Sequence, residues 1–154
     1  MTQRIAAPYV FAPEAIKAMY ALQNSFKTSG LDPVLMELVR LRASQINGCT
    51  FCIHMHVTDL RTQGEPEMRL YMLDAWREST LYMDREHAAL SWTEALTRLS
   101  KTHAPDADYA VLKAQFTEAE QVQLTLLIGA INTWNRFSVG LRVAHPVDAP
   151  RAEA

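Results

Sequence analysis

The two cysteines of this chain stand close together, and a histidine follows them at helical spacing. Cys49 and Cys52 are separated by Thr50 and Phe51, and His56 comes four residues after Cys52. A Cys-X-X-Cys pair can close an intramolecular disulfide, and thiols at such positions often have a lowered pKa. On a helix, residues at i, i+3 and i+7 lie along one face. This row of side chains therefore predicts redox chemistry.

The spacing also suggests different roles for the two cysteines. Cys52 and His56 form an i,i+4 pair that can touch, whereas Cys49 lies two turns from the imidazole. If Cys52 attacks a peroxide, Cys49 can condense with the resulting sulfenic acid to form a disulfide. The thioredoxin precedent instead makes the first cysteine the reactive one. That precedent belongs to a βαβ scaffold, for which this chain shows no strand pattern.

Glu37 is the third member of the predicted site. It lies among apolar residues, where a carboxylate is costly unless it is paired. It comes eleven residues before Gly48, and His56 comes eight residues after that glycine. A helical hairpin about Gly48 would bring the two together, and a Glu37–His56–Cys52 relay could orient the imidazole and move protons. Taken singly, glutamates and histidines are more often solvated or structural.

Other residues with chemical potential have plainer interpretations. His54 points to a different face from His56 and is predicted to be peripheral. Trp92 and Trp134 are predicted to serve packing. An alternative class is zinc binding, in which Cys49, Cys52, His56 and Glu37 supply four ligands. A row along one helix is less natural for tetrahedral closure than pairs from two segments, so this stays the alternative.

Helical periodicity and caps dominate the chain, and no run of period-two alternation appears, so we predict an all-α fold. The expected helices cover about 13–28, 33–47, 49–64, 66–74, 84–99, 106–115 and 117–140. Asp32 is predicted to cap the second helix and Gly48 to end it. Asp84 is expected to cap a later helix, and Thr117 with Glu120 forms a capping box. Residues 145–154 are predicted to be a frayed tail.

Composition indicates one domain over residues 1–154. The chain has 154 residues, of which 49% are hydrophobic and 21% charged, enough for a core that needs no disulfide staple. The net charge of −2 offers no basic field, so neither nucleic acid nor an anionic membrane is an expected partner. Neither a signal peptide nor a membrane span is evident, so we expect a cytoplasmic location, where structural disulfides are rare.

Glu37, the stretch Ile46-Asn47-Gly48-Cys49-Thr50-Phe51-Cys52 and His56 together resemble the active-site segment of the AhpD-like alkylhydroperoxidases, within the carboxymuconolactone decarboxylase superfamily. Residues 84–90 and 132–137 look like two further segments of that family, so the resemblance covers about 20–142. It implies an all-helical domain with a core over about 13–142, assembled into homo-oligomers such as trimers or hexamers.

The resemblance also implies an activity, which is thiol-dependent reduction of a peroxide substrate. Carried over by position, Cys52 is the peroxidatic thiol, Cys49 resolves it, and Glu37 with His56 relays protons. No cofactor or metal is implied, and an external dithiol reductant recycles the pair. Well-known members carry histidine where this chain has Phe51, so one member of their relay is absent. The decarboxylase branch lacks the cysteine pair, which disfavours decarboxylation. A disulfide oxidoreductase or redox-responsive protein using the same pair is the closest alternative.

Overall fold

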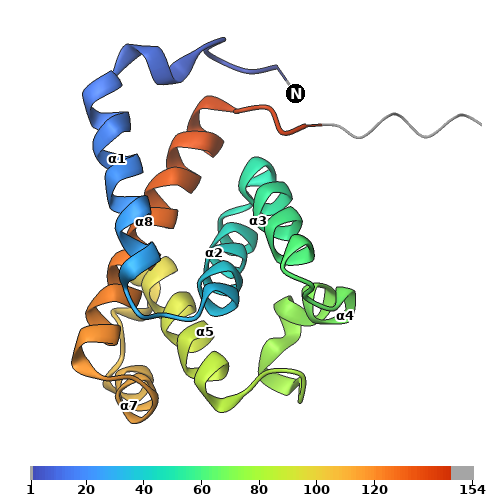
Figure 1. The fold of residues 1–154 in the computed structure, drawn as a ribbon, viewed down its shortest axis with the longest axis vertical. Coiled ribbons are helices and arrows are strands. Elements are labelled where there is room, and N and C mark those ends of the chain that lie inside the picture. The colour runs from blue at the N-terminus through green and yellow to red at the C-terminus, as the bar shows by residue number, and fades with distance from the viewer. Residues whose placement is uncertain (1, 147–154) are drawn as a thin grey trace, which may run out of the picture.

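The described part of the chain is built entirely from helices. The computed structural model describes residues 2–146, which form eight α-helices and three short 3-10 helices, with no strand among them (Figure 1). The α-helices are α1 (Pro13–Ser25), α2 (Pro33–Asn47), α3 (Thr50–Thr62), α4 (Glu67–Tyr71), α5 (Asp84–Thr97), α6 (Leu99–Thr102), α7 (Asp106–Gln115) and α8 (Glu118–Leu141). The 3-10 helices are η1 (Pro8–Phe11), η2 (Phe26–Thr28) and η3 (Met72–Glu78). The predicted all-α fold is confirmed.

Helix α2 is central, with α3, α5 and α8 packed around it (Figure 1). Residues 35–44 of this helix are all buried. A helix that is covered on every side must find a partner for each of its polar groups, because an unpaired buried charge is costly. The polar side chains of α2 are therefore held by neighbouring helices, and Arg42 donates to the Glu94 carboxylate of α5 at 2.7 and 2.9 Å.

Two apolar clusters meet at α2 and α5. One joins α2 and α5 to the end of α1 and to α7 and α8, and the other joins them to α3, α4 and η3. Leu35 and Val39 of α2 belong to the first cluster, while Leu38 and Leu41 of the same helix belong to the second. Because burial of apolar side chains stabilises both clusters, the position of α3 relative to α2 is set by packing along its whole length.

The ends of α2 follow the rules that predicted them. Asp32 is the N-cap, and its Oδ1 accepts the Leu35 N–H at 2.8 Å. Gly48 ends the helix in the left-handed region, with φ of 65°. A residue with a side chain is strained in that conformation, which is why glycine commonly ends a helix. The predicted boundaries of this helix are confirmed.

The starts of two later helices give one confirmation and one correction. Thr117 and Glu120 form the expected capping box of α8. The prediction that Asp84 caps α5 is wrong, because Asp84 is already helical and Met83 is the N-cap. The Met83 N–H donates to the Glu86 carboxylate at 2.8 Å. The Glu86 side chain, in the first turn of the helix, thus satisfies the backbone N–H of Met83. A sequence rule that looks for a capping side chain at Asp84 does not consider this hydrogen bond.

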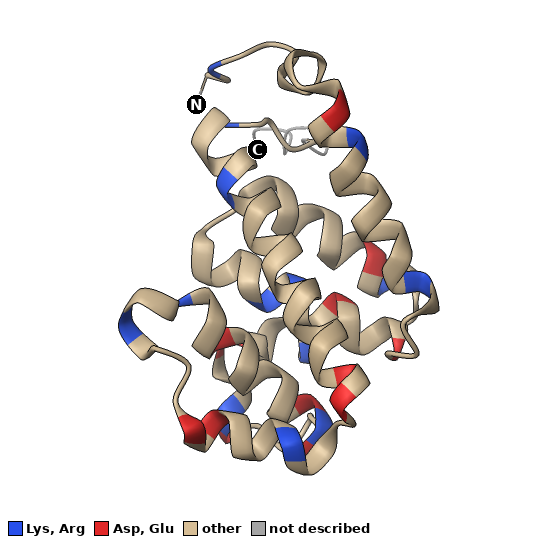
Figure 2. Cartoon of the chain, turned by 90° about the vertical axis from the view of Figure 1, so that its left-hand side faces the viewer, with Lys and Arg blue, Asp and Glu red and all other residues tan. Residues whose placement is uncertain are grey.

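Charged residues of both signs are interspersed along the helices, as the blue and red segments of Figure 2 show. Several of them form ion pairs between elements, as Arg69 does with Glu86 and Arg85 with Glu120. Within residues 2–146, no helix is both long and apolar enough to cross a membrane. Most of the predicted tail, from residue 147 onward, lies outside the described residues.

Candidate active site

The cysteine pair forms the start of α3. Cys49 is the N-cap and Cys52 lies in the first turn, with 5.3 Å between their Cα atoms and a disulfide joining their sulfurs. The Cys52 N–H donates to Cys49 Sγ at 3.3 Å, so the sulfur takes the place of a capping oxygen. Only 1% of Cys49 and 2% of Cys52 is exposed. The predicted Cys-X-X-Cys pair at a helix start is confirmed.

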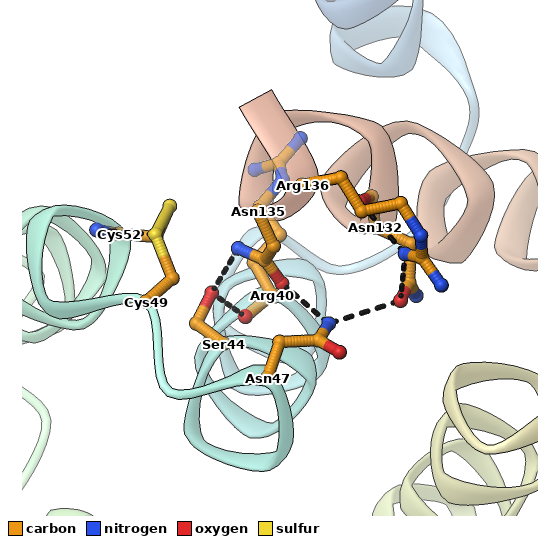
Figure 3. The surroundings of a disulfide bond; sticks show 8 residues. All are labelled: Arg40, Ser44, Asn47, Cys49, Cys52, Asn132, Asn135 and Arg136. Carbon is orange, nitrogen blue, oxygen red and sulfur yellow. Dashed lines mark hydrogen bonds between the residues drawn. A yellow bond between two sulfur atoms is a disulfide. The ribbon is translucent and has the colours of Figure 1, made fainter. Parts of the chain in front are cut away.

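A polar network holds the turn that precedes the disulfide (Figure 3). The Asn47 amide donates to Asn132 Oδ1 at 3.0 Å and to Asn135 Oδ1 at 2.9 Å, which ties the end of α2 to α8. The Asn135 amide donates in turn to Ser44 Oγ at 3.0 Å. The Cys49 N–H donates to the Ser44 carbonyl at 3.0 Å. These bonds fix the first cysteine relative to both helices, and they give a role to the Asn-rich segment of α8.

Glu37 and His56 meet across the α2–α3 hairpin. His56 Nδ1 lies 2.7 Å from Glu37 Oε2, with 1% of the histidine and 9% of the glutamate exposed. The predicted contact between these two residues is confirmed. It forms because α2 and α3 run away from Gly48 side by side, so residues at similar distances from the turn face each other.

Sequence reasoning missed Arg40, the second partner of Glu37. Arg40 lies one helical turn further along α2 and forms an ion pair with Glu37 Oε1. Burial by itself raises the pKa of Glu37, but the hydrogen bond and charge of His56 and the charge of Arg40 outweigh burial and hold that pKa below its ordinary value. The carboxylate is therefore ionised at neutral pH and accepts the Nδ1–H of His56. The i,i+3 spacing of Glu37 and Arg40 was the available signal.

The other nitrogen of His56 is unpartnered. Among fully buried side-chain nitrogens and oxygens of residues 2–146, His56 Nε2 is the one that lacks a hydrogen bond. Cys52 and His56 line the same cavity, which has a volume of about 130 Å³. In the disulfide form no hydrogen bond joins Nε2 to the Cys52 sulfur, so the two share the cavity without being bonded.

The remaining walls of this cavity are mostly apolar and come from α3 itself and from distant segments. They are Tyr9, Tyr20, Gln23, Phe51, Met55, Ile131, Trp134 and Ser138. Trp134 was predicted to serve packing, yet it lines the cavity, and its indole N–H donates to Gln23 Oε1 at 3.0 Å. Trp92, by contrast, is buried in the core as predicted. Sequence reasoning missed Tyr9 and Tyr20, for which no local pattern gave a signal.

The groups that could bind a metal differ from the predicted alternative. Within residues 2–146, the one set of three such residues whose ligand atoms lie within 4.8 Å of one another is Glu37, His56 and Asp59. The cysteine sulfurs are joined to each other and do not belong to this set. Asp59 is largely exposed, but partial desolvation of its carboxyl together with the charge of Glu37 raises its pKa.

His54 lies apart from the site, in agreement with its predicted peripheral role. It lines a separate groove with Thr50 and Arg61, and its ring centroid is 5.7 Å from that of His145. Its side chain is absent from the cavity that Cys52 and His56 share. Among the residues that line this cavity His56 is the one histidine, and Phe51 occupies the position just before the second cysteine.

Comparison with known proteins gives relatives of similar length. The chain is 40% identical over 141 residues to the uncharacterized protein YdfG of Bacillus subtilis, covering 92% of this chain and 95% of that protein. It is 32% identical over 136 residues to the uncharacterized protein YnjA of Escherichia coli, covering 88% of this chain and 72% of the relative.

Solved structures extend the likeness to the fold. A protein of unknown function from Agrobacterium tumefaciens, proposed as an antioxidant defence protein AhpD, is 45% identical, with a TM-score of 0.91 over 96% of this chain and 100% of that one. An uncharacterized peroxidase-related protein from a Silicibacter species is 25% identical, with a TM-score of 0.75 over 87% of this chain and 71% of the other. The model of the carboxymuconolactone decarboxylase family matches residues 13–95, which include α2 and the whole Cys49–His56 segment. The chain belongs to the carboxymuconolactone decarboxylase family and has its AhpD-like fold.

Proposed function

We propose that this protein is a thiol-dependent peroxidase in which Cys52 attacks the peroxide and Cys49 resolves the product to a disulfide. The observation that carries the proposal is the shared cavity of Cys52 and His56, together with the buried Nε2 of that histidine, which has no hydrogen-bond partner. The similarity to a peroxidase-related protein and to a proposed antioxidant defence protein supports the same class of activity.

His56 is suited to act as the base for Cys52. Its Nδ1–H is held by the ionised Glu37, so whenever the ring is neutral its lone pair lies on Nε2. A base oriented by a third group is the arrangement that activates nucleophiles in many unrelated enzymes. The buried position of Nε2 leaves it without a competing partner within residues 2–146. We therefore assign to this nitrogen the removal of the thiol proton of Cys52 when the pair is reduced.

The chemistry then runs in two steps. The Cys52 thiolate attacks one peroxide oxygen, the O–O bond breaks, and the leaving oxygen takes the proton held by His56, which gives a sulfenic acid and an alcohol or water. Cys49 next attacks the Cys52 sulfur, the S–O bond breaks, and the thiol proton of Cys49 joins the departing hydroxyl group, which leaves as water. The product is the disulfide present in the structure. A dithiol must then supply two electrons to restore the thiols.

The cavity favours a small organic hydroperoxide over a charged substrate. Its volume of about 130 Å³ is comparable to that of roughly four water molecules. Apolar and aromatic side chains form most of its walls, and burial with the nearby Tyr20 raises the pKa of Tyr9, so this phenol stays neutral. Neutral, partly apolar hydroperoxides therefore match the site better than anionic ones.

Intact-mass measurement after a stoichiometric pulse of cumene hydroperoxide or hydrogen peroxide tests the proposal. Reduced wild-type protein should lose two hydrogens, Cys49→Ser should form a sulfenic acid that dimedone traps, and Cys52→Ser should not react. Persistence of both thiols in wild type while peroxide remains would reject the peroxidase function. In that case, exchange with a partner disulfide would become the leading explanation of the pair.

A further inference from the structure

We propose that the electron donor attacks Cys49 from a groove of its own, so that oxidant and reductant reach the two sulfurs through different openings. The inference rests on the proposed function, because it assigns the second half of the same cycle. It concerns a site outside the Cys52 cavity, and it names the sulfur that first bonds to the donor.

The two cysteines of the disulfide line different spaces. A groove of about 470 Å³ is lined by Cys49 but not by Cys52. The cavity of about 130 Å³ is lined by Cys52 but not by Cys49. Phe51 and Ser138 line both spaces, so these two side chains form the partition between them. Only 1% of Cys49 and 2% of Cys52 is exposed. A reagent therefore approaches each cysteine through the space which that cysteine lines.

The groove suits a thiol reagent better than the cavity does. Attack on a disulfide brings a nucleophilic sulfur toward one sulfur along the S–S axis, together with the carbon chain that bears it. The groove is more than three times as large as the cavity, whose walls include the rings of Tyr9, Tyr20 and Trp134. Arg142 also lines the groove, and its positive charge favours an approaching thiolate.

The local environment of the sulfurs supports the same order of events. When Cys49 is attacked, Cys52 leaves as a thiolate, and His56 in the shared cavity can protonate it. When the mixed disulfide is later resolved, Cys49 leaves as a thiolate, and the Cys52 N–H already points at its sulfur at 3.3 Å. Each departing sulfur therefore has its own stabilising group.

The proposed reduction balances as two exchanges. A donor thiol gives up its proton and attacks Cys49 Sγ, the Cys49–Cys52 bond breaks, and its electron pair leaves on Cys52 Sγ, which takes up that proton by way of His56. The second thiol of the donor then attacks the donor sulfur of the mixed disulfide, that bond breaks, and Cys49 leaves as a thiolate. Two electrons pass from the dithiol to the protein, and the donor departs as a disulfide.

Trapping with a monothiol tests which sulfur is attacked. Wild-type protein is oxidised to the disulfide with diamide, which needs no peroxidase activity, and is mixed briefly with 2-mercaptoethanol. Acid quenching, maleimide labelling of the free thiol at low pH and fragmentation mass spectrometry of the peptide follow. At the earliest times we expect mercaptoethanol on Cys49 and maleimide on Cys52. The reverse pattern, or equal labelling of the two, would overturn the proposal.

Two matched substitutions test whether the openings are separate. Val139 lines only the groove and is 45% exposed, while Met55 lines only the cavity. Val139→Trp should slow reduction of the diamide-made disulfide by dithiothreitol about tenfold, with little change in oxidation by cumene hydroperoxide. Met55→Trp should do the opposite. The proposal fails if Val139→Trp slows oxidation but not reduction, or if Met55→Trp is the variant that blocks dithiothreitol.

Failure of the proposed function gives a different result from failure of this inference. If the protein does not consume peroxide at all, the trapping and dithiothreitol experiments on the diamide-oxidised protein still report which sulfur is attacked. If peroxide is consumed but the adduct forms on Cys52, the peroxidase survives and the separate reductant groove is rejected.

Discussion

Replacing Glu37 by glutamine removes the negative charge that orients His56 while nearly preserving the shape of the side chain. The bond between His56 Nδ1 and Glu37 Oε2 is 2.7 Å long and buried. A hydrogen bond to a charged group contributes about 1.5–3 kcal/mol. If that contribution is realised in the transition state for oxidation of Cys52, its loss corresponds to a rate decrease of about 10- to 150-fold.

The same substitution also affects folding, because it leaves Arg40 without its carboxylate partner. The Arg40 and Glu37 side chains are 10% and 12% exposed. Removing one partner of a fully buried pair costs about 3–5 kcal/mol, and glutamine can still accept a hydrogen bond, so we expect a loss of about 2 kcal/mol. Urea unfolding measures this loss separately from the rate.

The assay is single-turnover oxidation of reduced protein by cumene hydroperoxide, followed by acid quenching and counting of thiols by mass across a range of pH. Glu67→Gln is the matched control, since it removes the same charge from the exposed ion pair with Arg61. This control should oxidise within about twofold of the wild-type rate. A Glu37→Gln variant that folds and oxidises at the wild-type rate, with an unchanged pH profile, would refute the relay.

Further predictions concern stability. Burial raises the pKa of Glu37 and Glu94, but hydrogen bonds and neighbouring cations outweigh it and lower both below the ordinary value of 4.5. The stability that these two carboxylates contribute is therefore fully present above their unfolded-state pKa and is lost as pH falls through the lowered values. Urea unfolding at pH 3 to 6 should show that the free energy of unfolding declines below about pH 4.5. The decline should be shallower in Glu37→Gln, which lacks one of the two carboxylates. Asn47→Ala leaves the buried Asn135 Oδ1 without a donor, while Asn132 Oδ1 keeps its bond from Arg136, so the variant should lose about 1–3 kcal/mol in thermal unfolding, whereas Asn24→Ala on α1 should change little. Gly48→Ala, at φ of 65°, should cost about 1 kcal/mol, and an unchanged unfolding midpoint would contradict the strain assigned to that turn.

Local rules predicted the elements that carry the site. The capping side chain of Asp32 and the left-handed Gly48 bound α2, and the capping box of Thr117 and Glu120 starts α8. Each of these features depends on hydrogen bonds or backbone sterics within a few residues, so a short window of sequence contains all the information needed. The cap of α5 was mispredicted because the helix begins one residue earlier than expected, with Met83 as its N-cap and the Glu86 carboxylate accepting the Met83 N–H.

The pairing of Glu37 with His56 was predictable for a related reason. A hairpin with a single turn at Gly48 leaves few registers, and a carboxylate among apolar residues needs a partner. The sequence could not show that Arg40 would share the carboxylate, since an i,i+3 arginine can also extend into solvent. Because neighbouring helices pack against α2 on all sides, the Arg40 side chain does not extend into solvent, and its ion pair with Glu37 is buried.

By itself, the sequence determined an all-helical chain with a redox-capable cysteine pair at a helix start and a histidine within reach of a glutamate. Only the tertiary structure decided what surrounds the two sulfurs. Tyr9, Tyr20 and Trp134 come from three distant helices, and the partition between cavity and groove depends on how α8 packs beside Phe51. Side chains far apart in sequence become neighbours only through the packing of whole helices, which no local periodicity or spacing encodes.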